Sequence, residues 1–160
     1  MIYFCAVNDI SIGSKFYNSV ELPSKNNDKI RWGITELSSN TFIKVNKDDL
    51  IFFYFKGNII GIGKVMKTEV DKDLSEKLWG INKHKLNGDI YWSNIIYFSA
   101  YNSISFPFDK IIEIGNYSEN FLIRRIIGLN KTGEQRIIKD FGNEANFIED
   151  ILKNYSNQNS

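Results

Sequence analysis

The chain has 160 residues, of which 42% are hydrophobic and 14% aromatic, a size and composition typical of one domain with one core. Lys and Arg number 20 and Asp and Glu 19, so the formal net charge is +1 and a polyelectrolyte or a long disordered chain is excluded. No segment approaches the roughly 20 consecutive apolar residues of a membrane-spanning helix, and the N-terminal sequence lacks the basic flank of a signal peptide. We therefore expect a cytoplasmic protein with no membrane partner.

The first half of the chain contains short segments rich in β-branched and aromatic residues, which predict strands. Residues 2–7, "IYFCAV", are the first of these, and residues 8–20 are expected to carry a short helix that Gly13 weakens. Residues 49–55 and 58–66 are predicted to form an antiparallel hairpin, because the "KGN" between them supplies residues that tolerate positive φ.

The second half continues with strand patterns and ends in helical ones. Residues 95–106, "IIYFSAYNSISF", and 108–114, "FDKIIEI", are both predicted strands. Residues 118–129 have apolar residues at helical spacing behind Ser118 as N-cap, whereas 133–142 fit a short helix or a strand. Residues 143–155 predict a C-terminal amphipathic helix, with Asn143 as its N-cap.

This order of elements predicts a single α+β domain over residues 1–155. Strands dominate the middle of the chain and helices stand between the first strands and at the end, as in small β-barrels with flanking helices. Residues 156–160, "SNQNS", are expected to fray, and they are a candidate start of a linker to a further domain of the same chain.

Few residues in the chain could carry catalysis or bind metal. One histidine, His84, and one cysteine, Cys5, exclude a zinc site rich in these ligands, and Cys5 lies in an apolar run that predicts a buried, inert thiol. The acidic groups at 47–49 and 69–73 adjoin predicted turns and are expected to be solvated. Motifs of nucleotide hydrolysis and of the common hydrolases are absent from the sequence. We therefore expect a binding module without cofactor, metal or catalytic residues.

The three tryptophans are the most informative residues. Trp92 precedes a strand-like run and is expected to pack in the core. Trp32 and Trp79 are each followed by a glycine, Gly33 and Gly80, which lets a ligand approach the backbone closely. Two indole rings can sandwich a planar base, and each stack contributes about 1–3 kcal/mol.

The order of the motifs resembles the EVE and YTH branches of the PUA-like superfamily. The motifs are "YFCAVND", "RWGIT", "IKVNKDDLIFFYFKGNIIGIGKV", "KLWG" and "IYWSNIIYF", within a similarity that extends roughly over residues 2–152. The resemblance implies a PUA-like (EVE/YTH-type) curved β-barrel with flanking helices that reads bases, often modified ones. Within these branches, the chain resembles the N-terminal DNA-specificity domain of modification-dependent restriction systems of the McrB type.

The resemblance also implies a base-binding site. Trp32 and Trp79 correspond to the walls of an aromatic cage, Asn8 and Asp9 to the groups that hydrogen-bond the base edge, and Ile81 or Leu86 to the third wall. Lys131 corresponds to a phosphate contact. Further basic residues would meet phosphates if they gather on one face: Lys15, Lys29, Arg31, Lys83 and Lys85.

The expected function is capture of a flipped, methylated base, with modified DNA favoured over RNA as partner. A free-standing reader of modified RNA is the first alternative, because no residue that senses a ribose hydroxyl is identifiable. An enzyme like the ASCH relatives of the same superfamily would need a Lys, Asp or Glu grouping in the pocket, for example Lys83 or Asp9 beside Trp32. A protein-interaction module would use exposed tyrosines such as Tyr17 and Tyr117.

Overall fold

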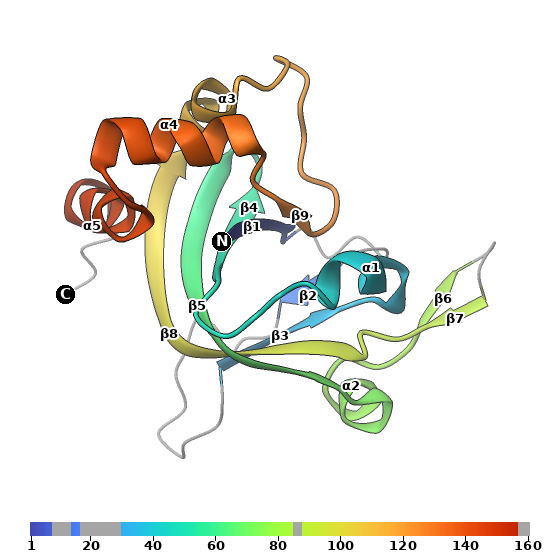
Figure 1. Ribbon diagram of the computed structural model, residues 1–160. Coiled ribbons are helices and arrows are strands. Elements are labelled where there is room, and N and C mark those ends of the chain that lie inside the picture. Colours follow the sequence, from blue (N-terminus) through green and yellow to red (C-terminus); the bar gives the residue numbers. More distant parts are fainter. Residues whose placement is uncertain (8–13, 17–29, 85–87, 157–160) are drawn as a thin grey trace.

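A mixed sheet organises the fold, with strands in the order β2-β3-β8-β5-β4-β1-β9 (Figure 1). The computed structural model describes residues 1–7, 14–16, 30–84 and 88–156, and of residues 14–16, 82 and 84 the backbone alone. Neighbouring strands pair antiparallel except β1 and β4, which are parallel. The predicted α+β class is therefore confirmed. The sheet strands are β1 Ile2–Ala6, β2 Ser14–Phe16, β3 Ile30–Ile34, β4 Leu50–Phe55, β5 Asn58–Val70, β8 Asn94–Pro107 and β9 Ile127–Gly128.

The two long strands β5 and β8 give the sheet its curvature. Their pairing shifts register between Ile59 and Gly61, and again on either side of Val65. Such bulges add residues to one strand, bend it and increase its twist. Both strands consequently curve through the molecule and take part in both ends of the sheet (Figure 1).

The sheet does not close into the expected barrel. Its outermost strands are β2 and β9, and within the described ranges no hydrogen-bonded pairing joins them. Each is short, three residues in β2 and two in β9, and each pairs with only one neighbour there. Strands this short provide too few backbone groups for a continuous closing ladder. The expectation of a barrel is corrected to an open, strongly curved sheet.

The predicted hairpin is confirmed as β4 and β5. Phe55 pairs with Asn58, so the connection has two residues, Lys56 with φ 44° and Gly57 with φ 82°. Positive φ at both positions is the geometry whose twist matches the flanking strands. The turn chemistry in the sequence therefore identified this pair of strands.

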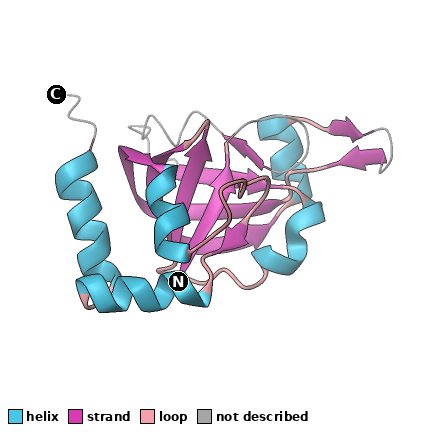
Figure 2. Ribbon diagram, turned by 90° about the horizontal axis from the view of Figure 1, so that it is seen from above, coloured by secondary structure: helices cyan, strands magenta, loops and turns pink. Residues whose placement is uncertain are grey.

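Helices cover two regions around the sheet, as Figure 2 shows from above. α3, α4 and α5 pack against one end of the sheet, where Phe147 of α5 is buried with Phe4, Phe52 and Ile123 in a helix-side core. α5 begins as predicted, with the Asn143 side chain accepting a hydrogen bond from Asn146 N at 2.8 Å. The remaining elements are η2 Glu36–Ser38, α1 Ser39–Phe42, α2 Lys72–Trp79, β6 Asn82–His84, β7 Gly88–Ile90, α3 Phe108–Gly115, α4 Lys131–Phe141 and α5 Glu144–Tyr155.

Three predicted elements were wrong where the structure describes them. Residues 108–114 form helix α3 instead of a strand, with Phe108 and Ile111 buried one turn apart. Residues 118–129 form no helix; they run from a turn into the short strand β9. Residues 14–16 are strand β2, and the rest of the helix predicted over 8–20 lies outside the described residues. No described helix is both long enough and apolar enough to cross a membrane.

Candidate functional site

The indole of Trp79 lies directly on the backbone of Gly33. Trp79 is the last residue of α2, whose first turn is capped by the Asp71 side chain accepting from Leu74 N at 2.9 Å. A Cβ added at Gly33 would stand 2.4 Å from Cζ3 of that indole, closer than any real contact. Gly80 follows with φ 74°, a conformation that a glycine adopts without strain. The absence of a side chain at residue 33 thus allows the indole to sit against the sheet.

Trp79 belongs to an aromatic cluster on this face of the sheet. Trp79, Trp92, Ile95 and Tyr97 are all buried and pack together, with Leu74 and Leu78 of α2 and Met66 of β5 half-buried around them. The burial of Trp92 confirms its predicted place in the core. We call Trp79, Trp92, Ile95 and Tyr97 the outer aromatic cluster.

Charged side chains surround the Tyr97 end of this cluster. Arg31 is directly opposite Tyr97 in the β3–β8 register, and Lys67 is opposite it in the β5–β8 register. Lys67 Nζ stands 4.8 Å from the centre of the Tyr97 ring and 3.9 Å from Glu69 Oε2. Burial, and then Glu69, raise the pKa of the Tyr97 hydroxyl, whereas Arg31 lowers it. The hydroxyl is therefore neutral at pH 7 and stands between a cation and an anion.

A second lysine lies on an aromatic ring nearby. Lys72 Nζ, at the start of α2, is 4.1 Å from the centre of the Tyr91 ring. Tyr91 directly precedes Trp92, and the backbone of Asp71 donates to Ser93 O at 2.9 Å, so the start of α2 is fixed beside this segment. Strand register brings these groups together from distant parts of the chain, which explains why the sequence motifs did not reveal Lys67, Glu69 or Tyr97.

The predicted two-tryptophan cage is not formed in this structure. Trp32 is 0% exposed and its ring packs edge-on against Phe53, with 5.1 Å between ring centres. It lies in the central core with Cys5, Phe53 and Ile126, whereas Trp79 lies in the outer aromatic cluster. Successive residues of a strand point to opposite faces, so Trp32 and the Gly33 face that Trp79 covers are on opposite sides of β3. The two indoles therefore do not face each other across one pocket.

The other predicted site residues are dispersed. Ile81 is half-buried just after Gly80, Lys83 is exposed on β6, and Lys131 is exposed at the first position of α4, which packs at the helix-side core. Arg31, in contrast to Lys83 and Lys131, is placed at the outer aromatic cluster, because strand register sets it opposite Tyr97. The remaining predicted residues have no described side chain: Asn8, Asp9, Lys15, Lys29, Lys85 and Leu86.

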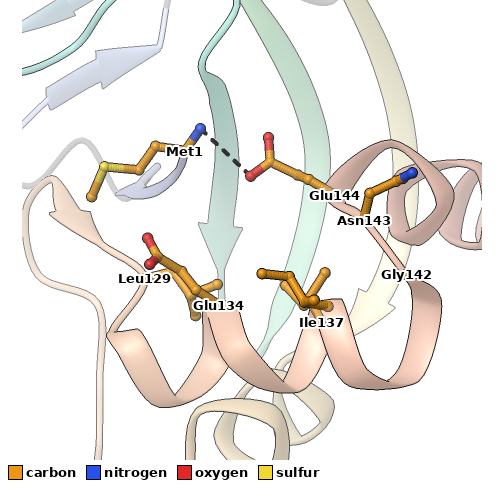
Figure 3. Close-up of a pocket in the computed structure, with 8 residues that line it drawn as sticks. Met1, Leu129, Glu134, Ile137, Gly142, Asn143 and Glu144 are labelled. Atoms are coloured by element: carbon orange, nitrogen blue, oxygen red, sulfur yellow. Dashed lines mark ion pairs between the residues drawn. The ribbon is translucent and has the colours of Figure 1, made fainter.

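An apolar groove that the sequence did not predict lies between the N-terminus and helices α4 and α5 (Figure 3). Its volume is about 460 Å³, and Met1 N and Glu144 Oε2 form an ion pair of 3.5 Å across it. The charged side chains in its lining are both carboxylates, so it is unsuited to phosphate. The groove is lined by Met1, Leu129, Glu134, Ile137, Ile138, Gly142, Asn143 and Glu144.

The buried thiol and the acidic groups of the chain have structural surroundings. Cys5 is fully buried, as predicted, and burial raises the pKa of its thiol. Asp49 accepts from Asn46 N at 2.8 Å, and Asp71 is the cap of α2. Within the described ranges, no group of three or more His, Cys, Asp or Glu side chains could hold a metal ion.

Comparison with known proteins adds no family assignment. No protein-family model matches the chain, and no curated protein matches its sequence significantly.

Proposed function

We propose that the chain is a nucleic-acid-binding module that captures a displaced base on the indole of Trp79. The contact between Trp79 and Gly33 carries this proposal. The indole covers a stretch of strand that has no side chain, and it stands at the end of a helix that is followed by Gly80. Because the buried indole lies directly on the strand, an incoming base would displace it from Gly33 and then stack between the Trp79 ring and the Gly33 backbone.

The edge of such a base would meet polar groups at the same cluster. Arg31 donates from a guanidinium, and the neutral hydroxyl of Tyr97 both donates and accepts, so both can read a base edge. Arg31 and Gly33 lie on the same face of β3, one residue apart on either side of Trp32. Recognition would therefore combine one aromatic stack with hydrogen bonds from strands β3 and β8.

The energetics favour a base that is easily displaced. A single stack contributes about 1–3 kcal/mol, whereas extruding a base from a duplex costs a few kcal/mol. Burying one added methyl group contributes on the order of 1 kcal/mol more. Trp79 alone therefore balances the cost of extrusion only for a modified, mispaired or single-stranded base.

We place this activity in the DNA-specificity part of a McrB-type modification-dependent restriction system, with a free-standing reader of modified RNA as the alternative. Support comes from the similarity of the sequence motifs to EVE and YTH domains of the PUA-like superfamily. A strongly curved, largely antiparallel sheet with helices at its ends is compatible with such a domain. We assign the domain a binding role without a catalytic step.

Tryptophan fluorescence and affinity measurements test the proposal. The titrants are otherwise identical DNA and RNA oligonucleotides, unmodified or carrying N6-methyladenine, 5-methylcytosine or 5-hydroxymethylcytosine. Trp79→Ala should weaken the preferred ligand by about 5- to 150-fold, the equivalent of losing one stack. Leu78→Ala, from the same helix and packed against the outer aromatic cluster, is the matched control and should retain affinity. Unchanged affinity in a folded Trp79→Ala protein would contradict the proposal.

A further inference from the structure

Two neighbouring arginines, Arg124 and Arg125, are held at the surface by the isoleucines on either side of them. They lie in the segment that connects α3 to β9, where both arginines are exposed. Ile123 is 2% exposed and belongs to the helix-side core, and Ile126 is 6% exposed and belongs to the central core. Because these anchors enter two different cores, the backbone between them is fixed and presents both guanidinium groups to solvent.

The stretch around these arginines carries no negative charge. Between Glu119 and Glu134 the only charged residues are Arg124, Arg125 and Lys131. Within the described part of the chain, neither arginine forms an ion pair. Among the described residues, no carboxylate therefore neutralises their charge.

The end of α1 brings a further cation to the same side. The Tyr3 hydroxyl donates to Lys44 O at 3.2 Å, and Tyr3 is also paired with Gly128 of β9. Ile126 shares the central core with Phe42 of α1. The segment after α1, with Lys44 exposed, therefore lies beside the segment that follows Arg125. We call Arg124, Arg125 and Lys44 the arginine patch.

We propose that the arginine patch binds the phosphodiester backbone of the nucleic acid whose base is captured at Trp79. This inference rests on the proposed function and adds to it the surface that meets the phosphates. A guanidinium donates two parallel hydrogen bonds to phosphate and keeps its charge at every physiological pH. Two such groups on a fixed backbone, neither of them paired with a carboxylate of the described residues, suit a chain of phosphates. Exposed Ile43 and Ile127 beside them offer apolar contacts to sugars.

Arg124 and Arg125 form a local pair of cations, although the chain as a whole is nearly neutral. With a formal net charge of +1, the protein cannot attract a polyanion by its overall charge. Phosphate binding then depends on local clusters of cations without acidic neighbours. The cations beside Trp79 do not form such a cluster, because Lys67 is paired with Glu69 and α2 exposes Asp73 and Glu76.

The test is the salt dependence of oligonucleotide binding by a double variant, Arg124→Gln with Arg125→Gln. The ligand is one single-stranded oligonucleotide, prepared without modification and with the preferred modified base. Each lost contact to a single strand should reduce the slope of log affinity against log salt by about 0.7, so the double variant should lose about 1.4. Modified and unmodified strands should weaken by the same factor. Arg124→Lys with Arg125→Lys keeps the charge and should retain most of the slope.

The matched control is Lys139→Gln with Lys153→Gln, which removes two exposed charges from α4 and α5 and should leave the slope unchanged. The slope could stay unchanged in the folded arginine variant while Trp79→Ala still weakens binding. That result overturns phosphate binding by the arginine patch and leaves the proposed function standing. A reduced slope with no effect of Trp79→Ala supports the patch and overturns base capture at Trp79. Binding to vesicles containing phosphatidylserine, without binding to the oligonucleotide, overturns both.

Discussion

The six-membered ring of Trp79 occupies the space that a side chain at residue 33 would fill. An added Cβ at Gly33 would stand 2.4, 2.7 and 2.8 Å from three carbons of that ring. Gly33→Ala should therefore force the indole away from β3 and destabilise the fold by about 1–3 kcal/mol, the range for overpacking a core. Urea unfolding measures this loss.

A double variant identifies the origin of that loss. If the overlap with the indole is the cause, Gly33→Ala should cost much less in a Trp79→Ala background than in the wild type. Equal costs in the two backgrounds would show that the strand itself, and not the ring, requires glycine.

Trp32 should behave as a core residue. It is 0% exposed against Phe53, so Trp32→Ala is expected to cost about 3–5 kcal/mol of stability, as truncations of large buried aromatics do. A wall of an open aromatic cage, the role expected for Trp32, would have tolerated this truncation. Leu122→Ala, at a side chain that is 56% exposed, is the control and should change stability by less than about 0.5 kcal/mol. A Trp32→Ala protein of normal melting temperature would contradict this placement.

Asn130 is the N-cap of α4, and it has a second role that Asn143, the N-cap of α5, lacks. Its Oδ1 accepts from Gly133 N at 2.8 Å, while its Nδ2 donates to Gly115 O at 2.8 Å and ties α4 to α3. Asn130→Asp keeps the cap but turns an oxygen toward that carbonyl, so it should destabilise by about 1–3 kcal/mol. Asn143→Asp should be nearly neutral, because only the capping oxygen is used there. Equal melting temperatures for the two variants would contradict the role of the Gly115 contact.

Cys5 should make the stability fall at alkaline pH. Burial raises the pKa of its thiol above the ordinary value of 9.0, so the folded protein keeps the proton that the unfolded chain releases. This contribution is complete below pH 9.0 and is lost as pH rises above it, by at most about 1.4 kcal/mol per pH unit. Cys5→Ala should show a shallower alkaline decline in urea unfolding. Identical declines in both proteins would place the titration elsewhere, for example at tyrosines.

Local chemistry in the sequence predicted some elements well. The β4–β5 hairpin was predictable because Lys56 and Gly57 tolerate the positive φ of a two-residue turn. α5 was predictable because Asn143 caps an amphipathic pattern. In both cases the deciding interactions lie within a few residues of one another.

Other elements depend on distant contacts. Residues 108–114 are rich in isoleucine, which favours strands, yet Phe108 and Ile111 are buried one turn apart against α4 and the sheet. The spacing of Ile123, Ile126 and Leu129 imitates a helix, but Ile123 and Ile126 enter different cores from an extended segment. Likewise, Trp32 and Gly33 are adjacent in sequence, and only the alternation of β3 assigns them to opposite faces.

The long strands β5 and β8 have a consequence for how the protein opens. Ile59 and Val65 of β5 enter the helix-side and central cores, and β8 contributes Phe106, Ile96 and Tyr97 to the helix-side, central and outer clusters, respectively. If the helix-side core, the central core or the outer aromatic cluster loses its packing, β8 is disturbed, and β8 also contributes to the other two. Amide hydrogen exchange along both strands should therefore be governed by one cooperative global event, with a similar free energy of opening from one end to the other.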